Sequence, residues 1–171
     1  MTRRKLAEAK FFLAHLEEQR TTQHDWAAFT FYFSAFISAA RSVPWVFRAE
    51  DRELYDRVQP AWHNALSQDD RDLLDFMNER RLDVVKRKGA ELEGVLELVA
   101  IMDARLKPGD WQVPMVQFGT RDAPTPQVGV LTAKFELAGQ PADVVATCRR
   151  YVELLESLVR AREQLGRPAT Q

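Results

Sequence analysis

The densest group of residues able to bind an anion is a run of cations in the middle of the chain. Arg80, Arg81, Lys86, Arg87 and Lys88 place five cations within nine residues, in a chain whose net charge is −1. A guanidinium can bind phosphate through two parallel hydrogen bonds, and an ammonium acts as a point charge. Glu79, just before the run, and Asp83, within it, offset only part of this charge. The run therefore predicts an anion- or nucleic-acid-binding patch centred on Arg80, Arg81 and Lys86.

A structural role for these arginines stays open beside the binding role. Arg81 lies near the middle of the apolar face of its predicted helix, and Arg80 lies at the edge of that face. Arginine rarely enters such a face unless it is paired, snorkels to water, or lines an interface or cleft. Arg41 poses the same question, because it is the only charged residue between Trp26 and Phe47. For Arg41 we expect a buried structural ion pair.

Other reactive residue types show no pattern of a known site. The three histidines lack metal-ligand spacing, and Asp69, Asp70, Asp72 and Asp75 fit the negatively charged start of a helix better than a metal site. Cys148 lies on an apolar helical stripe, which predicts a buried, inert thiol. No glycine-rich phosphate loop or nucleophile motif occurs. We therefore expect neither a metal nor a cofactor.

Composition indicates one protein domain of ordinary size. The chain has 171 residues, 46% of them hydrophobic, which is enough for one domain with a core. Its sequence pI is near 6.3, so its overall charge does not indicate nucleic-acid binding. A single cysteine suits a reducing cytoplasm, and no signal peptide is recognisable. The segment 26–47 is long enough to suggest a membrane span, but its serines, Arg41 and Pro44 favour a buried helix and no membrane association.

Helical periodicity dominates the chain. The segment 26–47 is apolar nearly all round, so we expect it to be the enclosed central helix of a bundle, kinked or ended near Pro44. Ser67 is the predicted N-cap of the fourth helix, and Pro60 is expected to strain or divide the third. The predicted helices span about residues 3–20, 26–47, 51–66, 68–88 and 141–164, the last beginning at Pro141.

A β insertion is predicted at about residues 90–138, before the last helix. Residues 128–137 alternate apolar and polar side chains, and residues 111–118 form a second candidate strand at an edge position. Residues 92–102 fit either a strand or a helix, and a third strand is slightly favoured because a lone hairpin is marginal in water. Residues 166–171 are expected to form a flexible tail. The expected fold is mainly α, about five helices with a small antiparallel β insertion, as a single domain over residues 1–165.

The order of these elements resembles a known family. A charged first helix, the segment FTFYFSAFISAARSV, a tryptophan in the third helix, ERRLDVVK in the fourth and CRRYVELLESLV in the last resemble the HEPN-like helical bundles of prokaryotes, including small bacterial members. The resemblance covers about two-thirds of the chain. It implies a homodimer. It also implies either a metal-independent ribonuclease that pairs an arginine with a histidine four to six residues further on, or a binding module that has lost this pair.

The position of the family's histidine holds Lys86 in this chain. RNA cleavage through the 2′-hydroxyl needs a base near neutrality, which imidazole supplies and an ordinary lysine does not. Arg57 and His63 match the spacing elsewhere, but about one such pair is expected by chance among 18 arginines and three histidines. Arg57 and His63 therefore remain weak catalytic candidates, and a surface arginine and a histidine beside Trp62 are the simpler interpretation.

The sequence therefore predicts a cytoplasmic homodimer that binds RNA, nucleotide or a protein partner with little or no catalysis. The first alternative is a metal-independent endoribonuclease of toxin or defence type, with an antitoxin or regulatory protein as partner. The second alternative is a purely structural oligomerisation protein.

Overall fold

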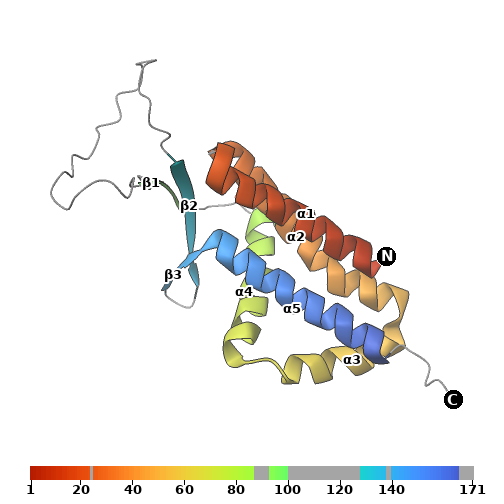
Figure 1. Ribbon diagram of the computed structural model, residues 1–171. Coiled ribbons are helices and arrows are strands. Elements are labelled where there is room, and N and C mark those ends of the chain that lie inside the picture. Colours follow the sequence, from red (N-terminus) through yellow and green to blue (C-terminus); the bar gives the residue numbers. More distant parts are fainter. Residues whose placement is uncertain (24, 87–92, 100–127, 138–139, 166–171) are drawn as a thin grey trace, which may run out of the picture.

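The protein is a helical bundle with a small sheet at one end (Figure 1). The computed structural model describes residues 1–23, 25–86, 93–99, 128–137 and 140–165. In chain order the elements are α1 (Thr2–Glu18), the π-helical turn η1 (Gln19–Gln23), α2 (Trp26–Glu50), α3 (Arg52–Asn64), α4 (Gln68–Lys86), β1 (Glu93–Val99), β2 (Val128–Leu137), β3 (Gln140–Asp143) and α5 (Val144–Leu165). The predicted fold class, mainly α with a small antiparallel sheet before the last helix, is confirmed.

Helix α2 is central and contacts α1, α3, α4 and α5. Asp25 caps it, because its carboxylate accepts a hydrogen bond of 3.0 Å from the backbone N–H of Ala28. The helix does not end at Pro44 but continues to Glu50. Burial of Val43 and Phe47 on either side of this proline, both fully inaccessible to water, offsets the lost backbone hydrogen bond.

One side of α2 is not enclosed, contrary to the prediction. The side chains facing the other helices are buried: Phe29, Phe33, Phe36, Ile37, Ala39, Ala40, Val43 and Phe47. Phe31 and Trp45 are 73% and 59% exposed on the outer side. The prediction was wrong here because an all-round apolar pattern does not say on how many sides a helix has neighbours.

Helix α3 is continuous and Pro60 lies inside it without dividing it. Asp51 caps this helix through a 3.0 Å hydrogen bond from the Leu54 N–H. Leu54 and Val58 then form a small second core with Phe47 of α2 and Leu158 of α5. Proline is tolerated because the neighbouring side chains are anchored on two other helices.

Ser67 caps the start of α4, as predicted. Its hydroxyl oxygen lies 3.2 Å from the backbone N–H of Asp70 and donates to the Asp70 carboxylate at 2.8 Å. Leu73 and Met77 are buried on the face of the helix that packs on the bundle. The described part of α4 ends at Lys86, and the predicted end near Gly89 lies outside the described residues.

Helix α5 begins at Val144, so the prediction that it begins at Pro141 was wrong. Pro141 lies in β3, opposite Glu136 of β2, in the edge strand of the sheet. An edge strand tolerates a residue without an N–H. Asp143 is the residue that caps α5, accepting a 2.7 Å hydrogen bond from the Ala146 N–H.

The sheet has the order β1-β2-β3 among the described residues, with both pairs antiparallel. Strand β1 settles the choice that was open for residues 92–102 in favour of a strand over 93–99, the part of this range that the structure describes, and β2 coincides with the predicted 128–137. The predicted strand at 111–118 and the tail 166–171 lie outside the described residues. Buried Phe135 anchors the sheet, because its ring lies 4.8 Å from Phe76 of α4 and 6.3 Å from Phe33 of α2.

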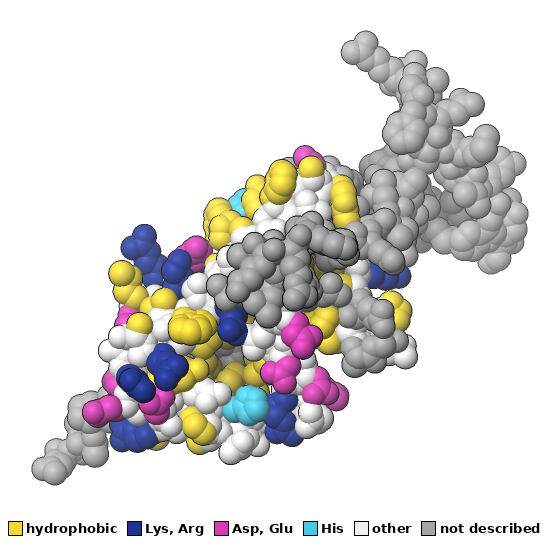
Figure 2. Space-filling model, turned by 180° about the vertical axis from the view of Figure 1, so that it is seen from behind, with side chains coloured by type: hydrophobic (Ala, Val, Ile, Leu, Met, Phe, Trp, Pro, Cys, Tyr) yellow, Lys and Arg dark blue, Asp and Glu magenta, His cyan; other side chains and the backbone are white. Residues whose placement is uncertain are grey.

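The surface carries both signs of charge. On the face shown in Figure 2, lysine and arginine side chains alternate with acidic groups and scattered hydrophobic side chains. Within the described residues, no helix has the length and apolar character needed to cross a membrane.

Candidate functional site

The predicted cations Arg80, Arg81 and Lys86 all lie on the last two turns of α4. Each residue turns the chain about 100° around the helix axis, so the three positions do not share one face. Arg81 follows buried Met77 by four residues and is therefore on the side of α4 that packs on the bundle. Arg80 falls on one edge of that side, and Lys86 is about opposite Met77. Arg87 and Lys88 lie outside the described residues.

Arg41 of α2 reaches α4 next to the Arg81 position. Its guanidinium donates a hydrogen bond to the side-chain oxygen of Asn78, a half-buried residue. Asn78 and Arg81 are three residues apart and hence neighbours on the helix surface. The α2–α4 contact therefore brings two arginine positions from different helices close together. Both arginines were predicted as unusual from the sequence, but nothing in the sequence indicated that they belong to one site.

Among the described residues, no carboxylate pairs with the guanidinium of Arg41. Its Nε is buried and has no hydrogen-bond partner among the described residues. The predicted ion pair for Arg41 is wrong, because the group that it binds there is a neutral amide. A half-buried cation without a carboxylate is energetically costly, and a bound anion would remove that cost.

A buried tyrosine lies within the electrostatic reach of Arg41. Burial raises the pKa of Tyr151 on α5 to about 12, and the positive charge of Arg41 opposes part of this rise. Tyr151 is only 3% exposed and its ring packs edge-on against Phe36, with the centroids 6.5 Å apart. At neutral pH the phenol is therefore neutral. It cannot neutralise the Arg41 charge.

Arg57 and His63 are not brought together by α3. Six residues on a helix separate them by roughly 9 Å along the axis and about 120° around it. Arg57 is exposed, whereas His63 is half-buried with its ring 6.5 Å from that of Trp62. The Trp62 indole donates a 2.7 Å hydrogen bond to Ser157. The geometry gives His63 a packing position beside Trp62, and His63 and Arg57 make no contact in the structure.

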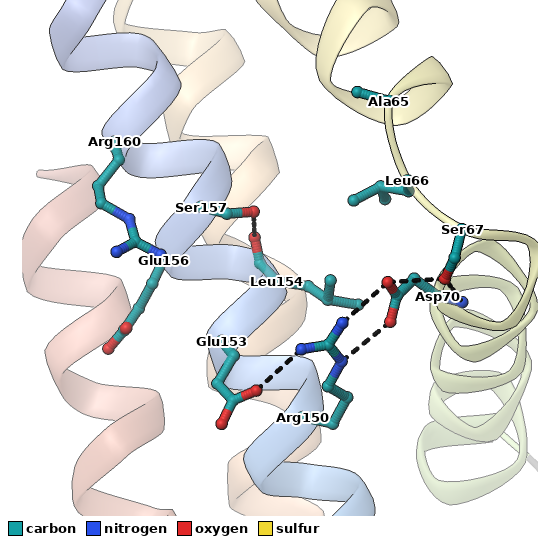
Figure 3. A pocket seen from close by; sticks show the side chains of 10 residues that line it. All are labelled: Ala65, Leu66, Ser67, Asp70, Arg150, Glu153, Leu154, Glu156, Ser157 and Arg160. Carbon is teal, nitrogen blue, oxygen red and sulfur yellow. Dashed lines mark hydrogen bonds and ion pairs between the residues drawn. The ribbon is translucent and has the colours of Figure 1, made fainter.

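A separate cleft of about 400 Å³ lies between the α3–α4 turn and α5 (Figure 3). Arg150 closes one side of it, donating two 2.9 Å hydrogen bonds to the carboxylate of Asp70 and one of 3.1 Å to Glu153. Leu66 and Leu154 form the apolar part of the lining. Sequence analysis assigned Asp70 to the start of α4 and missed its partner, because the two residues are 80 positions apart.

The cleft continues as shallow hollows along α5. One of about 490 Å³ shares Ser67, Asp70 and Arg150 with it, and another of about 380 Å³ shares Glu156 and Arg160. In the close-up, Arg160 and Glu156 extend on the side of α5 away from Asp70. The acidic and basic groups of the central cleft largely neutralise each other, so it offers an anion much less than the Arg41 region does.

Other chemistry finds little support among the described side chains. Cys148 is fully buried, and burial raises the pKa of its thiol well above the ordinary value, with a smaller contribution from the charge of Asp143. The thiol is therefore protonated and inaccessible, as the sequence predicted. Within the described residues no three His, Cys, Asp or Glu side chains are grouped to hold a metal ion.

Comparisons with protein-family models, curated proteins and solved structures return no significant match. The HEPN-like resemblance and the functions that it implies therefore stay predictions.

Proposed function

We propose that the protein is a homodimeric binding module, with little or no catalytic activity, that holds the phosphates of RNA or of a nucleotide where α2 meets α4. Arg41 and Arg81 form the centre of the proposed site, Arg80 contributes at its edge, and Lys86 adds positive charge from the opposite side of α4. This arrangement agrees with the resemblance to HEPN-like proteins that have lost the Arg–His pair, and with Lys86 in the expected histidine position.

The observation that carries the proposal is the state of Arg41. A charged guanidinium sits half-buried with an amide as its partner, and its buried Nε has no hydrogen-bond partner in the part of the chain that the structure describes. Removing a charge from water without pairing it costs several kcal/mol. A phosphate beside the half-buried guanidinium would neutralise its charge through charge-assisted hydrogen bonds, with the neighbouring Arg81 position supplying a second cation.

Binding of a fluorescently labelled mixed-sequence RNA, followed by anisotropy at low salt, tests the proposal. Arg81→Ala is expected to weaken binding about 10- to 100-fold, the value of one or two charge-assisted contacts. Lys86→Ala is the matched control, because it removes the same charge from the same helix on another side. We expect it to cost less than about three-fold. Equal losses in both variants, or no binding by the wild-type protein, would overturn the proposal.

The enzymatic alternative is tested with the same RNA in the presence of a chelator. We expect the RNA to stay intact after prolonged incubation with the wild-type protein, because Arg57 and His63 do not meet and Lys86 is a poor base near pH 7. Robust cleavage that disappears in His63→Ala would establish the ribonuclease instead. If the protein neither binds nor cleaves RNA or nucleotide, a structural or partner-binding role takes the place of both.

A further inference from the structure

The outer side of α2 carries no charged residue and leaves two aromatic side chains exposed. Its residues fall within about 80° of one another around the helix axis and are called here the outer α2 stripe. The members are Ala27, Phe31, Ser34, Ser38, Ser42, Trp45 and Ala49. Phe31 and Trp45 are the most exposed aromatic side chains among the described residues, at 73% and 59%. An isolated exposed aromatic is ordinary, but two on one charge-free helix face mark an interaction surface.

The serines of the stripe have already satisfied their hydroxyl groups. Ser34, Ser38 and Ser42 donate to the backbone carbonyls four residues earlier, at 3.0, 2.9 and 2.8 Å. Covering this surface would therefore leave no hydroxyl donor unpaired, which keeps the desolvation cost low. Serine side chains are also small, so a second helix can approach the α2 backbone closely.

The stripe reads the same in both directions from Ser38. Four residues away on each side is a serine, seven residues away is an exposed aromatic, and eleven residues away is an exposed alanine. Such a pattern is self-complementary for two antiparallel helices. A two-fold axis at Ser38 would bring Phe31 onto the partner's Trp45 and, by symmetry, Trp45 onto the partner's Phe31. This is the isologous contact that defines a two-fold dimer.

From this pattern we infer that α2 pairs antiparallel with α2 of a second copy, with the two-fold axis at Ser38. The inference rests on the homodimer in the proposed function and names its surface. It is independent of whether RNA is the ligand.

The area of the outer α2 stripe supplies the centre of a dimer interface, and the neighbouring helices must supply the rest. The stripe is about 33 Å long and one helix about 10 Å wide, which gives roughly 330 Å² per copy. A stable interface needs about 800 Å² per copy, so α1 and α4 must contribute the remainder. On the α1 side Phe11 is 56% exposed, and it adjoins α2 through His15, whose ring lies 4.4 Å from Phe11 and 4.7 Å from Tyr32.

The pairing would also join the two proposed anion sites. Arg41 follows Ser38 by three residues, roughly 4.5 Å along the helix axis. The two copies of Arg41 would then flank the two-fold axis, and one phosphate chain could contact both.

Single substitutions to cysteine, in a chain whose own Cys148 is buried, test the position of the axis. Facing helices about 8–10 Å apart, with Cα atoms about 2.3 Å from each axis, place two copies of Ser38 roughly 3.5–5.5 Å apart, within reach of a disulfide. We expect Ser38→Cys to form a covalent dimer under mild oxidation. In Ser42→Cys the two thiols would be about 12 Å apart along the helices, so this matched variant should remain uncrosslinked. A mixture of Ser34→Cys and Ser42→Cys should form the mixed disulfide. Equal crosslinking of Ser38→Cys and Ser42→Cys would overturn the inference.

Light scattering at about 10 μM tests the aromatic contacts. The wild-type protein and Leu165→Asp, a control at another exposed apolar residue, are expected to be dimers. The double variant Phe31→Asp with Trp45→Asp should be a monomer with an unchanged helical circular dichroism spectrum. A monomeric wild-type protein overturns both the inference and the homodimer, whereas the RNA anisotropy of that monomer still decides the binding function. A dimer that persists in the double variant overturns the α2 surface alone. If the double variant fails to fold, the comparison of Ser38→Cys with Ser42→Cys decides whether α2 forms the interface.

Discussion

At the scale of single residues, the proposed site depends on a conflict between stability and binding at Arg41. The sequence showed this residue as the one charge in an apolar helical segment, but the ion pair predicted for it was wrong. Its partner Asn78 is 37 positions away on another helix, so only the packing of α2 on α4 could show that an amide takes the place of a carboxylate. The high density of cations at the end of α4 could be read directly from the sequence. Their distribution around the helix follows from its register, which puts the Arg81 position next to Asn78, the residue that Arg41 contacts.

Replacing Arg41 should separate these two effects. Arg41→Met keeps the length of the side chain and removes a half-buried, incompletely bonded charge, so we expect stability to rise by about 1 kcal/mol. For a chain of this length that corresponds to roughly 2–4 °C in Tm. RNA affinity should fall in the same variant, whereas Arg41→Lys should keep part of it. A variant that loses both stability and binding would show that Arg41 has a structural role in α2–α4 packing.

At the scale of elements, local signals were most reliable where a side chain caps a helix. The serine before α4 was recognised because its hydroxyl bonds to the first turn a few residues away. The start of α5 was missed because Pro141 suits a first helical turn equally well, and only pairing with β2 draws it into a strand. Pro44 did not end α2 because burial on other helices outweighs a local preference. Elements specified by their own residues were predictable, and those specified by a distant partner were not.

The end of α2 provides a prediction about stability and pH. The carboxylate of Glu50 binds the amino group of Met1, the hydroxyl of Thr2 at 2.6 Å and the guanidinium of Arg162 at 2.8 Å, which joins α1, α2 and α5. The hydrogen bond from the Met1 amino group, and then that from Thr2, lower the pKa of Glu50 from 4.5 to about 2. A carboxylate with a lowered pKa in the folded state stabilises the protein above its unfolded pKa, and this stabilisation is lost as the pH falls from about 4.5 towards 2.

Glu50→Gln should therefore unfold at a lower denaturant concentration than the wild-type protein at pH 7. The difference between the two midpoints should shrink steadily between pH 4.5 and pH 2.5, because the wild-type carboxylate becomes protonated there. Urea titrations monitored by circular dichroism provide the comparison. A midpoint difference independent of pH would show that the contacts of Glu50 do not depend on its charge.

At the scale of the whole molecule, the arrangement of helices places the two proposed surfaces side by side. One edge of α2 meets α4 at Arg41, and its outer side carries the self-complementary stripe centred on Ser38. The hydrophobic pattern of the sequence predicted the bundle and its central helix. It could not show which side of that helix is left uncovered, because this depends on how many neighbours pack around it. The cleft between α4 and α5, with its Arg150–Asp70 ion pair, likewise became visible only in three dimensions.

Nuclear magnetic resonance of the Arg41 Nε–H group during titration with a short RNA tests whether Arg41 lies in the RNA-binding site. The signal is assigned by its absence in Arg41→Lys. Because this N–H has no partner in the described structure, we expect it to shift strongly on RNA binding, together with backbone amides around Asn78 and Arg81. These shifts should reverse when salt is added, since phosphate contacts weaken with ionic strength. An unchanged Arg41 signal, with shifts of the amides around Arg150 and Arg160, would place the binding site in the α5 cleft and rule out the proposed site at Arg41.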